Sequence, residues 1–227
     1  MIIPISDDYP TKVKPFLTFI IIAVNIILYI WIRFIDTVNL QNFINRWGFS
    51  PSSLSLLPSP IPIISMFSSM FLHGNFLHLL FNMWFLWIFG DNIEDAFGHF
   101  KFLIFYFLCH LGAILGHTLF YSQSSQPIIG ASGAISGVMA AYLLLYWKSS
   151  IKVLLYFTIM RIPALIFIIL WFTYQVIYGM SSLTYPGLFG NVGWFAHIGG
   201  FLMGIVLTIL LPKNPKRFIK KYRRTEI

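Results

Sequence analysis

Long apolar stretches alternate with short polar connections along most of the chain. Six of these stretches carry few charged residues, and most approach the ~20 residues that an α-helix needs to cross a hydrocarbon core of ~30 Å. The stretch that begins at Ser132 is one of the short ones. The pattern predicts six membrane-spanning helices, at residues 15–32, 77–92, 102–121, 132–147, 162–178 and 192–211.

The connection between the first two stretches differs from the others. It covers about residues 33–76 and is rich in serine and proline, with aromatic residues among them. A semi-apolar segment that prolines interrupt suits a structure lying in the membrane interface rather than crossing the bilayer. A floppy loop is the alternative. We therefore expect a long interfacial external loop here.

Composition supports the membrane assignment. The chain is 58% hydrophobic and 19% aromatic, and only 10% of its residues are charged. A soluble domain carries about 25% charged residues. The predicted fold class is therefore an all-α polytopic membrane protein. We expect one membrane domain over residues 1–227, with N-terminus 1–14, a six-helix core at about 15–211 and a basic tail at 212–227.

The positive charge is distributed unevenly along the chain. The net charge is +8, and a run of basic residues follows the last apolar stretch. With both termini in the cytoplasm, all but Arg33 and Arg46 of the 15 Lys and Arg residues are cytoplasmic, as the positive-inside rule requires. We expect the tail to bind anionic lipid headgroups and not nucleic acid. The expected location is the cytoplasmic membrane of a prokaryote.

Polar residues within membrane spans are costly and usually face an interior or a cavity. Three clusters of them occur here, around His78 and Asn82, around Ser132 in the sequence GASG, and at His197. All three spans concerned run inward, and each cluster lies near the start of its span. The clusters are therefore predicted at one depth, in the outer half of the bilayer.

Small residues recur every four positions in two of these spans. Such a stripe gives a smooth helix face that a second helix can approach closely. His197 shares a face with glycines of its own span. If the two striped helices are neighbours, the His197 imidazole can reach the Ser132 hydroxyl. The stripes are Gly133, Gly137 and Ala141, and Ala196, Gly200 and Gly204.

Together these residues can perform acyl transfer. A serine hydroxyl becomes a nucleophile when a base within hydrogen-bond reach accepts its proton, and His197 suits that role near neutral pH. The fifth and sixth stretches contain no Asp or Glu to orient the histidine, so a dyad is expected. The Ser132 backbone N–H, His78 and Asn82 can donate hydrogen bonds to an oxyanion.

Each residue also has a structural interpretation. Ser132 on its own is typical of a packing serine, and His197 of a core histidine. Zinc bound by His73, His78 and His197 is a further alternative, but the spacing departs from H-E-x-x-H and no carboxylate is adjacent. No metal and no other cofactor is expected. The occurrence of all these residues at matched depth favours catalysis.

These motifs resemble the rhomboid family of intramembrane serine proteases. The matching elements are G-x-S-G at 130–133, the histidines and asparagine from His73 to Asn82, A-H-x-x-G-x-x-x-G at 196–204 and FGDNIED at 89–95. The resemblance implies a six-helix rhomboid-like bundle, with Ser132 as nucleophile and His197 as base. It also implies an oxyanion hole made by His78, Asn82 and the Ser132 N–H, and structural roles for His73 and Glu94.

The resemblance further implies that the substrates are transmembrane proteins, which are cut at a small residue within a locally unstable helix. The site itself is expected to be a hydrated cavity open to the outside. It also suggests that the fifth span is a lateral gate. One departure is Ser136, where some members carry an aromatic residue that stacks on the histidine; Trp194 is a candidate to replace it. A transporter or a non-catalytic binder of membrane helices is the alternative function.

Overall fold

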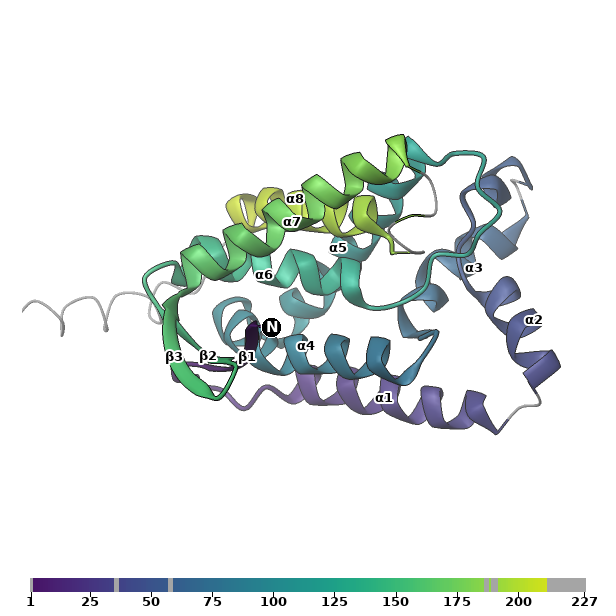
Figure 1. Ribbon diagram of the computed structural model, residues 1–227. Coiled ribbons are helices and arrows are strands. Elements are labelled where there is room, and N and C mark those ends of the chain that lie inside the picture. Colours follow the sequence, from purple (N-terminus) through teal and green to yellow (C-terminus); the bar gives the residue numbers. More distant parts are fainter. Residues whose placement is uncertain (1, 35–36, 57–58, 186–187, 189–191, 212–227) are drawn as a thin grey trace, which may run out of the picture.

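The computed structural model describes residues 2–34, 37–56, 59–185, 188 and 192–211. Most of these residues are helical (Figure 1). The basic tail at 212–227 lies outside the described residues, and with it the expected contact with lipid headgroups. The helices are α1 Phe16–Arg33, α2 Thr37–Trp47, α3 Pro60–Ser68, α4 Phe76–Phe97, α5 His99–Phe120, α6 Ser132–Tyr146, α7 Ala164–Thr184 and α8 Trp194–Leu210, with 3-10 turns η1 Pro51–Leu56 and η2 Ser69–Phe71.

A helix occupies each of the six stretches that the apolar pattern predicted. Three of them, α1, α5 and α7, are long and apolar enough to cross a membrane. A fourth span is counted when α3 with η2 and α4 are taken together, although the chain bends by 79° between them. Helices α6 and α8 are apolar but shorter. The described chain thus has three or four candidate spans, and a count of six crossings stays a prediction.

Apolar side chains cover much of the outer surface. On α1 and α7, Ile27 is 63% exposed and Leu170 is 60% exposed. A soluble protein rarely exposes so many large apolar side chains, whereas lipid contact stabilises them. With the candidate spans, this surface identifies a multi-pass integral membrane protein.

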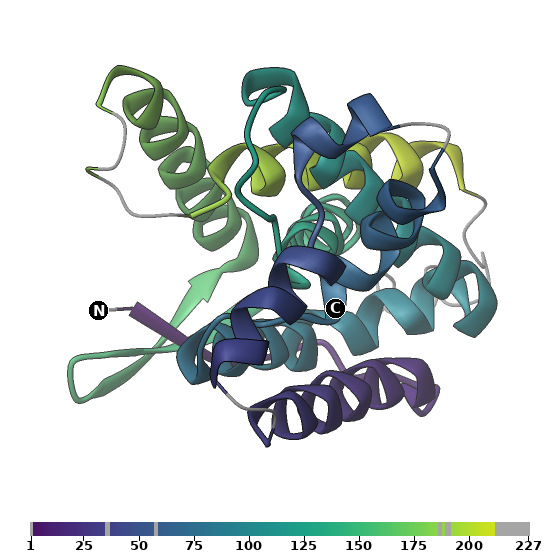
Figure 2. The same ribbon diagram turned by 90° about the vertical axis from the view of Figure 1, so that its right-hand side faces the viewer.

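Helix α6 lies in the middle of the bundle, in contact with α4, α5, α7 and α8 (Figure 2). The predicted stripes of small residues make its contact with α8. A Cβ added to Gly200 would lie 2.0 Å from the Gly133 oxygen, and one added to Gly204 would lie 2.5 Å from the Gly137 Cα. Only glycine permits backbones to approach this closely. The predicted α6–α8 contact is confirmed.

The segment between α1 and α4 is folded rather than a plain loop. Its described residues form α2, η1, α3 and η2. Proline starts two of these elements, at Pro51 and Pro60, where its missing N–H costs nothing. The described residues of this segment are therefore not a floppy loop, and their position in the membrane interface stays a prediction.

The expected all-α class is corrected to a mostly helical one, because the structure also contains a three-stranded antiparallel sheet that was not predicted. Strands β2 Ser150–Leu155 and β3 Thr158–Pro163 form a hairpin between α6 and α7, and β1 Ile2–Asp7 pairs with β2. The sheet lies at the end of the molecule opposite α2 and α3 (Figure 1). Because residues 158–163 are in a strand, α7 begins at Ala164 rather than at the predicted residue 162.

Candidate active site

Ser132 is the first residue of α6, as the sequence predicted. The turn before it depends on Gly130, whose φ of +110° is rarely open to other residues. The Gly130 N–H donates to the Ser69 oxygen at 2.9 Å and so fixes this turn to η2. No side chain among the described residues caps the start of α6. The first-turn N–H groups therefore remain available to a ligand.

The structure brings His197 to Ser132 from the first turn of α8. The His197 Nε2 lies 2.8 Å from the Ser132 Oγ, which is hydrogen-bond distance. The close packing of Gly133 against Gly200 allows this contact, because it leaves no side chains between the two helices. Neither Ser132 nor His197 is fully buried. A base and a hydroxyl are thus paired at hydrogen-bond distance.

Gln175 of α7 is a polar partner of His197 that sequence reasoning missed. Its Oε1 lies 2.7 Å from the His197 Nδ1, and its side chain is buried, with 4% exposed. The sequence prediction of a dyad rested on the absence of Asp and Glu from the fifth and sixth stretches. An amide inside an apolar span was nevertheless a usable signal, because buried polar groups in membrane helices are rarely without a partner.

His78 and Asn82 of α4 lie beside the turn that precedes Ser132. A Cβ on Gly130 would be 2.6 Å from the His78 Nε2 and 3.7 Å from the Asn82 Nδ2. One Asn82 N–H donates to the His78 backbone oxygen at 2.9 Å, and its second N–H is left for another acceptor. Both side chains are one helical turn apart on the face toward the site, as their spacing predicted.

Other residues named from the sequence have different surroundings. His73 is buried against the His78 ring, with 5.1 Å between ring centroids. Ser136 donates to the Ser132 backbone oxygen at 2.6 Å. Trp194 lies edge-on to His197 at 6.5 Å, so it does not stack on the ring as the missing aromatic residue would.

The described residues contain no group of three His, Cys, Asp or Glu side chains placed as metal ligands. His73 and His78 are in contact with each other, but only His197 of the three histidines is hydrogen-bonded to Ser132. Within the described part of the chain, the histidine that pairs with the Ser132 hydroxyl is therefore His197.

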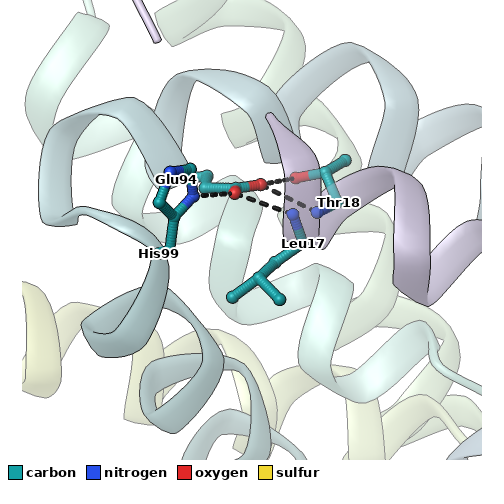
Figure 3. Close-up of polar contacts among 4 residues, drawn as sticks. All are labelled: Leu17, Thr18, Glu94 and His99. Atoms are coloured by element: carbon teal, nitrogen blue, oxygen red, sulfur yellow. Dashed lines mark hydrogen bonds and ion pairs between the residues drawn. The ribbon is translucent and has the colours of Figure 1, made fainter. Parts of the chain in front are cut away.

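Glu94 lies at the other end of α4 and holds the start of α1 (Figure 3). Its carboxylate accepts hydrogen bonds from the Leu17 N–H at 2.8 Å and from the N–H and Oγ1 of Thr18 at 2.7 Å each. The His99 ring nitrogen also contacts it. A carboxylate is well placed at a helix N-terminus, where N–H groups lack internal partners. These contacts agree with a structural role.

Comparison with known proteins identifies the family. Residues 62–214 match the rhomboid domain. Rhomboid-like protein 11, chloroplastic, of Arabidopsis thaliana is 33% identical over 152 residues, covering 64% of this chain and 51% of that protein. RHOMBOID-like protein 6, mitochondrial, of the same plant is 30% identical over 158 residues, covering 70% and 47%. Rhomboid protease AarA of Providencia stuartii is 32% identical over 155 residues, covering 62% and 53%.

The rhomboid domain match covers well over half of the sequence, so this chain belongs to the rhomboid family. The resemblance seen in the motifs is confirmed. The chain spans about half the length of the curated relatives it matches. Their names include a chloroplast protein and a mitochondrial protein beside a bacterial one, so the family does not single out a prokaryotic membrane.

Proposed function

We propose that this chain is an intramembrane serine endopeptidase, with Ser132 as the nucleophile and His197 as the general base. The observation that carries the proposal is the 2.8 Å contact between the Ser132 Oγ and the His197 Nε2. Family membership supports it, because relatives include proteins named as rhomboid proteases. A serine and a histidine at this distance are what nucleophilic catalysis requires.

In the first step the Ser132 Oγ attacks the carbonyl carbon of a peptide bond, and the His197 Nε2 takes the hydroxyl proton. The carbonyl π electrons move onto the oxygen, which becomes an oxyanion. The C–N bond then breaks, the amine leaves with the proton from His197, and Ser132 holds the acyl group as an ester. Water attacks this ester, with His197 again accepting a proton. The C–O bond to the Ser132 Oγ then breaks, that oxygen takes the proton back from His197, and the carboxylic acid product leaves.

The oxyanion needs donors that are already in place. The Ser132 N–H at the uncapped start of α6 is one, helped by the positive end of the helix dipole. The second N–H of Asn82 and the His78 ring are the others, since both lie against Gly130. This set supports the oxyanion role proposed for all three groups.

The proposed substrates are transmembrane segments of other proteins, the class on which rhomboid proteases act. Carbonyls within a helix are bonded to N–H groups four residues away. The segment must therefore unwind before Ser132 can attack. We expect cleavage at small residues near a locally unstable helix.

The proposal includes the orientation of the chain. Both termini are assigned to the cytoplasmic side, on the strength of the uneven distribution of Lys and Arg. In a Cys109→Ser background, a cysteine at Ser124 should react with an impermeant maleimide from outside, and one at Phe157 should not. The reverse reactivity would overturn this orientation. Labelling on vesicles made from separated native membranes would also identify the membrane in which the protein resides.

Labelling with a fluorophosphonate probe tests the activity. The native protein should be labelled, Ser132→Ala should lose labelling on the order of 10⁴-fold or more, and His197→Ala should be strongly reduced. Melting temperature in detergent serves as the control for folding. Labelling that persists in Ser132→Ala would contradict the nucleophile assignment and favour the alternatives, a transporter or a non-catalytic binder of membrane helices.

A further inference from the structure

We propose that Gln175 is a positioning residue that sets the ring plane and the tautomer of His197. This inference rests on the proposed function, because it concerns how the proposed base is held ready. It assigns to α7, a mostly apolar helix, a role in preparing the proton transfer at Ser132.

The hydrogen bonds of Gln175 determine which end of its amide faces His197. The Trp171 backbone carbonyl can only accept, and it lies 3.3 Å from the Gln175 Nε2. The NH₂ group is therefore directed at Trp171, one helical turn earlier. This leaves Oε1 as the atom that faces the His197 Nδ1 at 2.7 Å.

The oxygen in turn determines the tautomer. A carbonyl oxygen accepts and never donates, so the His197 Nδ1 must carry the proton in this hydrogen bond. In the neutral ring the Nε2 is then the unprotonated nitrogen. Because Nε2 is the atom 2.8 Å from the Ser132 Oγ, it is poised to accept the hydroxyl proton. The opposite tautomer would place a hydrogen between the two groups and remove the base.

Gln175 also fills the role left open by Ser136. The Ser136 hydroxyl is bonded to the backbone of its own helix and does not contact the histidine ring. The Trp171 ring is 6.1 Å from the His197 ring and tilted by 34°. Trp171 and Gln175 are four residues apart and therefore lie on the same face of α7. This face packs against the His197 ring through Trp171 and makes a hydrogen bond to its Nδ1 through Gln175.

The choice of an amide has a physical reason. A carboxylate buried in an apolar span carries a large desolvation cost unless it is paired. An amide supplies the same acceptor without a charge. The bond is also made across two helices, so it exists only while α7 is packed against α8. The readiness of the base is thereby coupled to the position of α7.

The experiment compares Gln175→Leu, Gln175→Glu and native protein by the rate of fluorophosphonate labelling across pH. Leucine keeps the size but has no acceptor, and we expect a loss of about 10- to 100-fold, the size of effect seen when the hydrogen-bond partner of a metal-ligating histidine is removed. Glutamate keeps an acceptor oxygen, so its rate above neutral pH should stay within a few-fold of native. Its acid limb should move to higher pH, because a carboxylate favours the protonated imidazole.

The matched control is Ser182→Ala on the same helix. Ser182 also makes a hydrogen bond to a distant segment, since its Oγ lies 3.0 Å from the hydroxyl of Tyr121, the residue that follows α5. It does not contact the site. Its labelling rate should stay within about two-fold of native. The other titratable groups whose charges act on His197 are His78 and His117, and every variant retains both.

Three results would overturn the positioning role: native labelling rates in Gln175→Leu, an equal loss in the Leu and Glu variants, or an acid limb that does not move in Gln175→Glu. An equal loss in Ser182→Ala would also overturn it, since general loosening of α7 would then explain the effect. Failure of the proposed function has a different signature, which is no labelling of native protein or labelling that survives Ser132→Ala.

Discussion

The two ends of α4 and α6 use polar residues in opposite ways. At the start of the two helices, Ser132 and His78 are only partly buried, and Asn82 keeps an unused N–H. At the far end, Glu94 is fully buried and both of its oxygens accept hydrogen bonds. One end retains donors for a ligand, and the other end uses its polar groups to join segments distant in sequence.

The far end includes a second example of this joining. The Asp7 carboxylate of β1 accepts from the Tyr142 hydroxyl of α6 at 2.7 Å and from the Asn92 amide of α4 at 2.9 Å. The Trp84 indole also donates to the Pro4 oxygen at 2.7 Å. The comparison teaches that a polar residue inside a membrane bundle is not by itself a sign of function. Its position relative to Ser132 and His197 is the more informative feature.

Apart from the proposed dyad itself, the largest effect at the open end is expected from Asn82→Ala. Loss of one oxyanion donor should slow cleavage of a transmembrane reporter about 10²- to 10³-fold without abolishing it. The only hydrogen bond that the side chain donates within the described residues goes to its own helix, so the melting temperature should change little. Measuring kcat/KM and the melting temperature together checks both statements. Unchanged turnover would remove Asn82 from the oxyanion role.

Glu94→Gln should give the reverse result. The amide has one acceptor oxygen where the carboxylate has two, and its NH₂ would face the N–H donors of α1. We expect the free energy of unfolding in detergent to fall by about 1–3 kcal/mol. The labelling rate per folded molecule should stay within a few-fold of native. A specific loss of labelling with normal stability would mean that this end also serves catalysis.

The smallest effect concerns Asp7 and pH. Burial raises the pKa of this carboxyl above its ordinary value of 3.8, and hydrogen bonds from Tyr142 and Asn92 only partly offset that. A raised pKa means that the stabilising contribution is fully present below pH 3.8 and is lost as the pH rises through the folded-state pKa. The contribution is measured as the difference in the free energy of unfolding between native protein and Asp7→Asn from pH 3.5 to 8.

In that series the native protein should lose on the order of 1 kcal/mol relative to Asp7→Asn as the pH rises. The variant has no carboxyl at this position, so it supplies the baseline for all other titrating groups. Parallel stability curves for the two proteins would contradict this prediction, because they would show that ionisation of Asp7 does not lower the stability of the folded protein. Glu94 would then be the one tested residue that supports the contrast between the two ends.

Much of the site was predictable because its residues stand out against an apolar background. Ser132 and His197 each occur near the start of a span, and glycine stripes indicated which helices make contact. Gln175 was not predicted, because its partner is 22 residues away and an amide does not titrate. The short helices between α1 and α4 were also not predicted, because each is too short to show a clear hydrophobic period.

The amino-acid sequence determined where the apolar helices lie, which helix faces are smooth enough to touch and which polar residues are candidates for chemistry. These properties follow from local spacing, because burial in a helix repeats with its turn. Tertiary structure alone decided that β1 joins a hairpin about 150 residues later and that Gln175 meets His197. Such contacts depend on how helices pack against each other, which no local pattern of residues specifies.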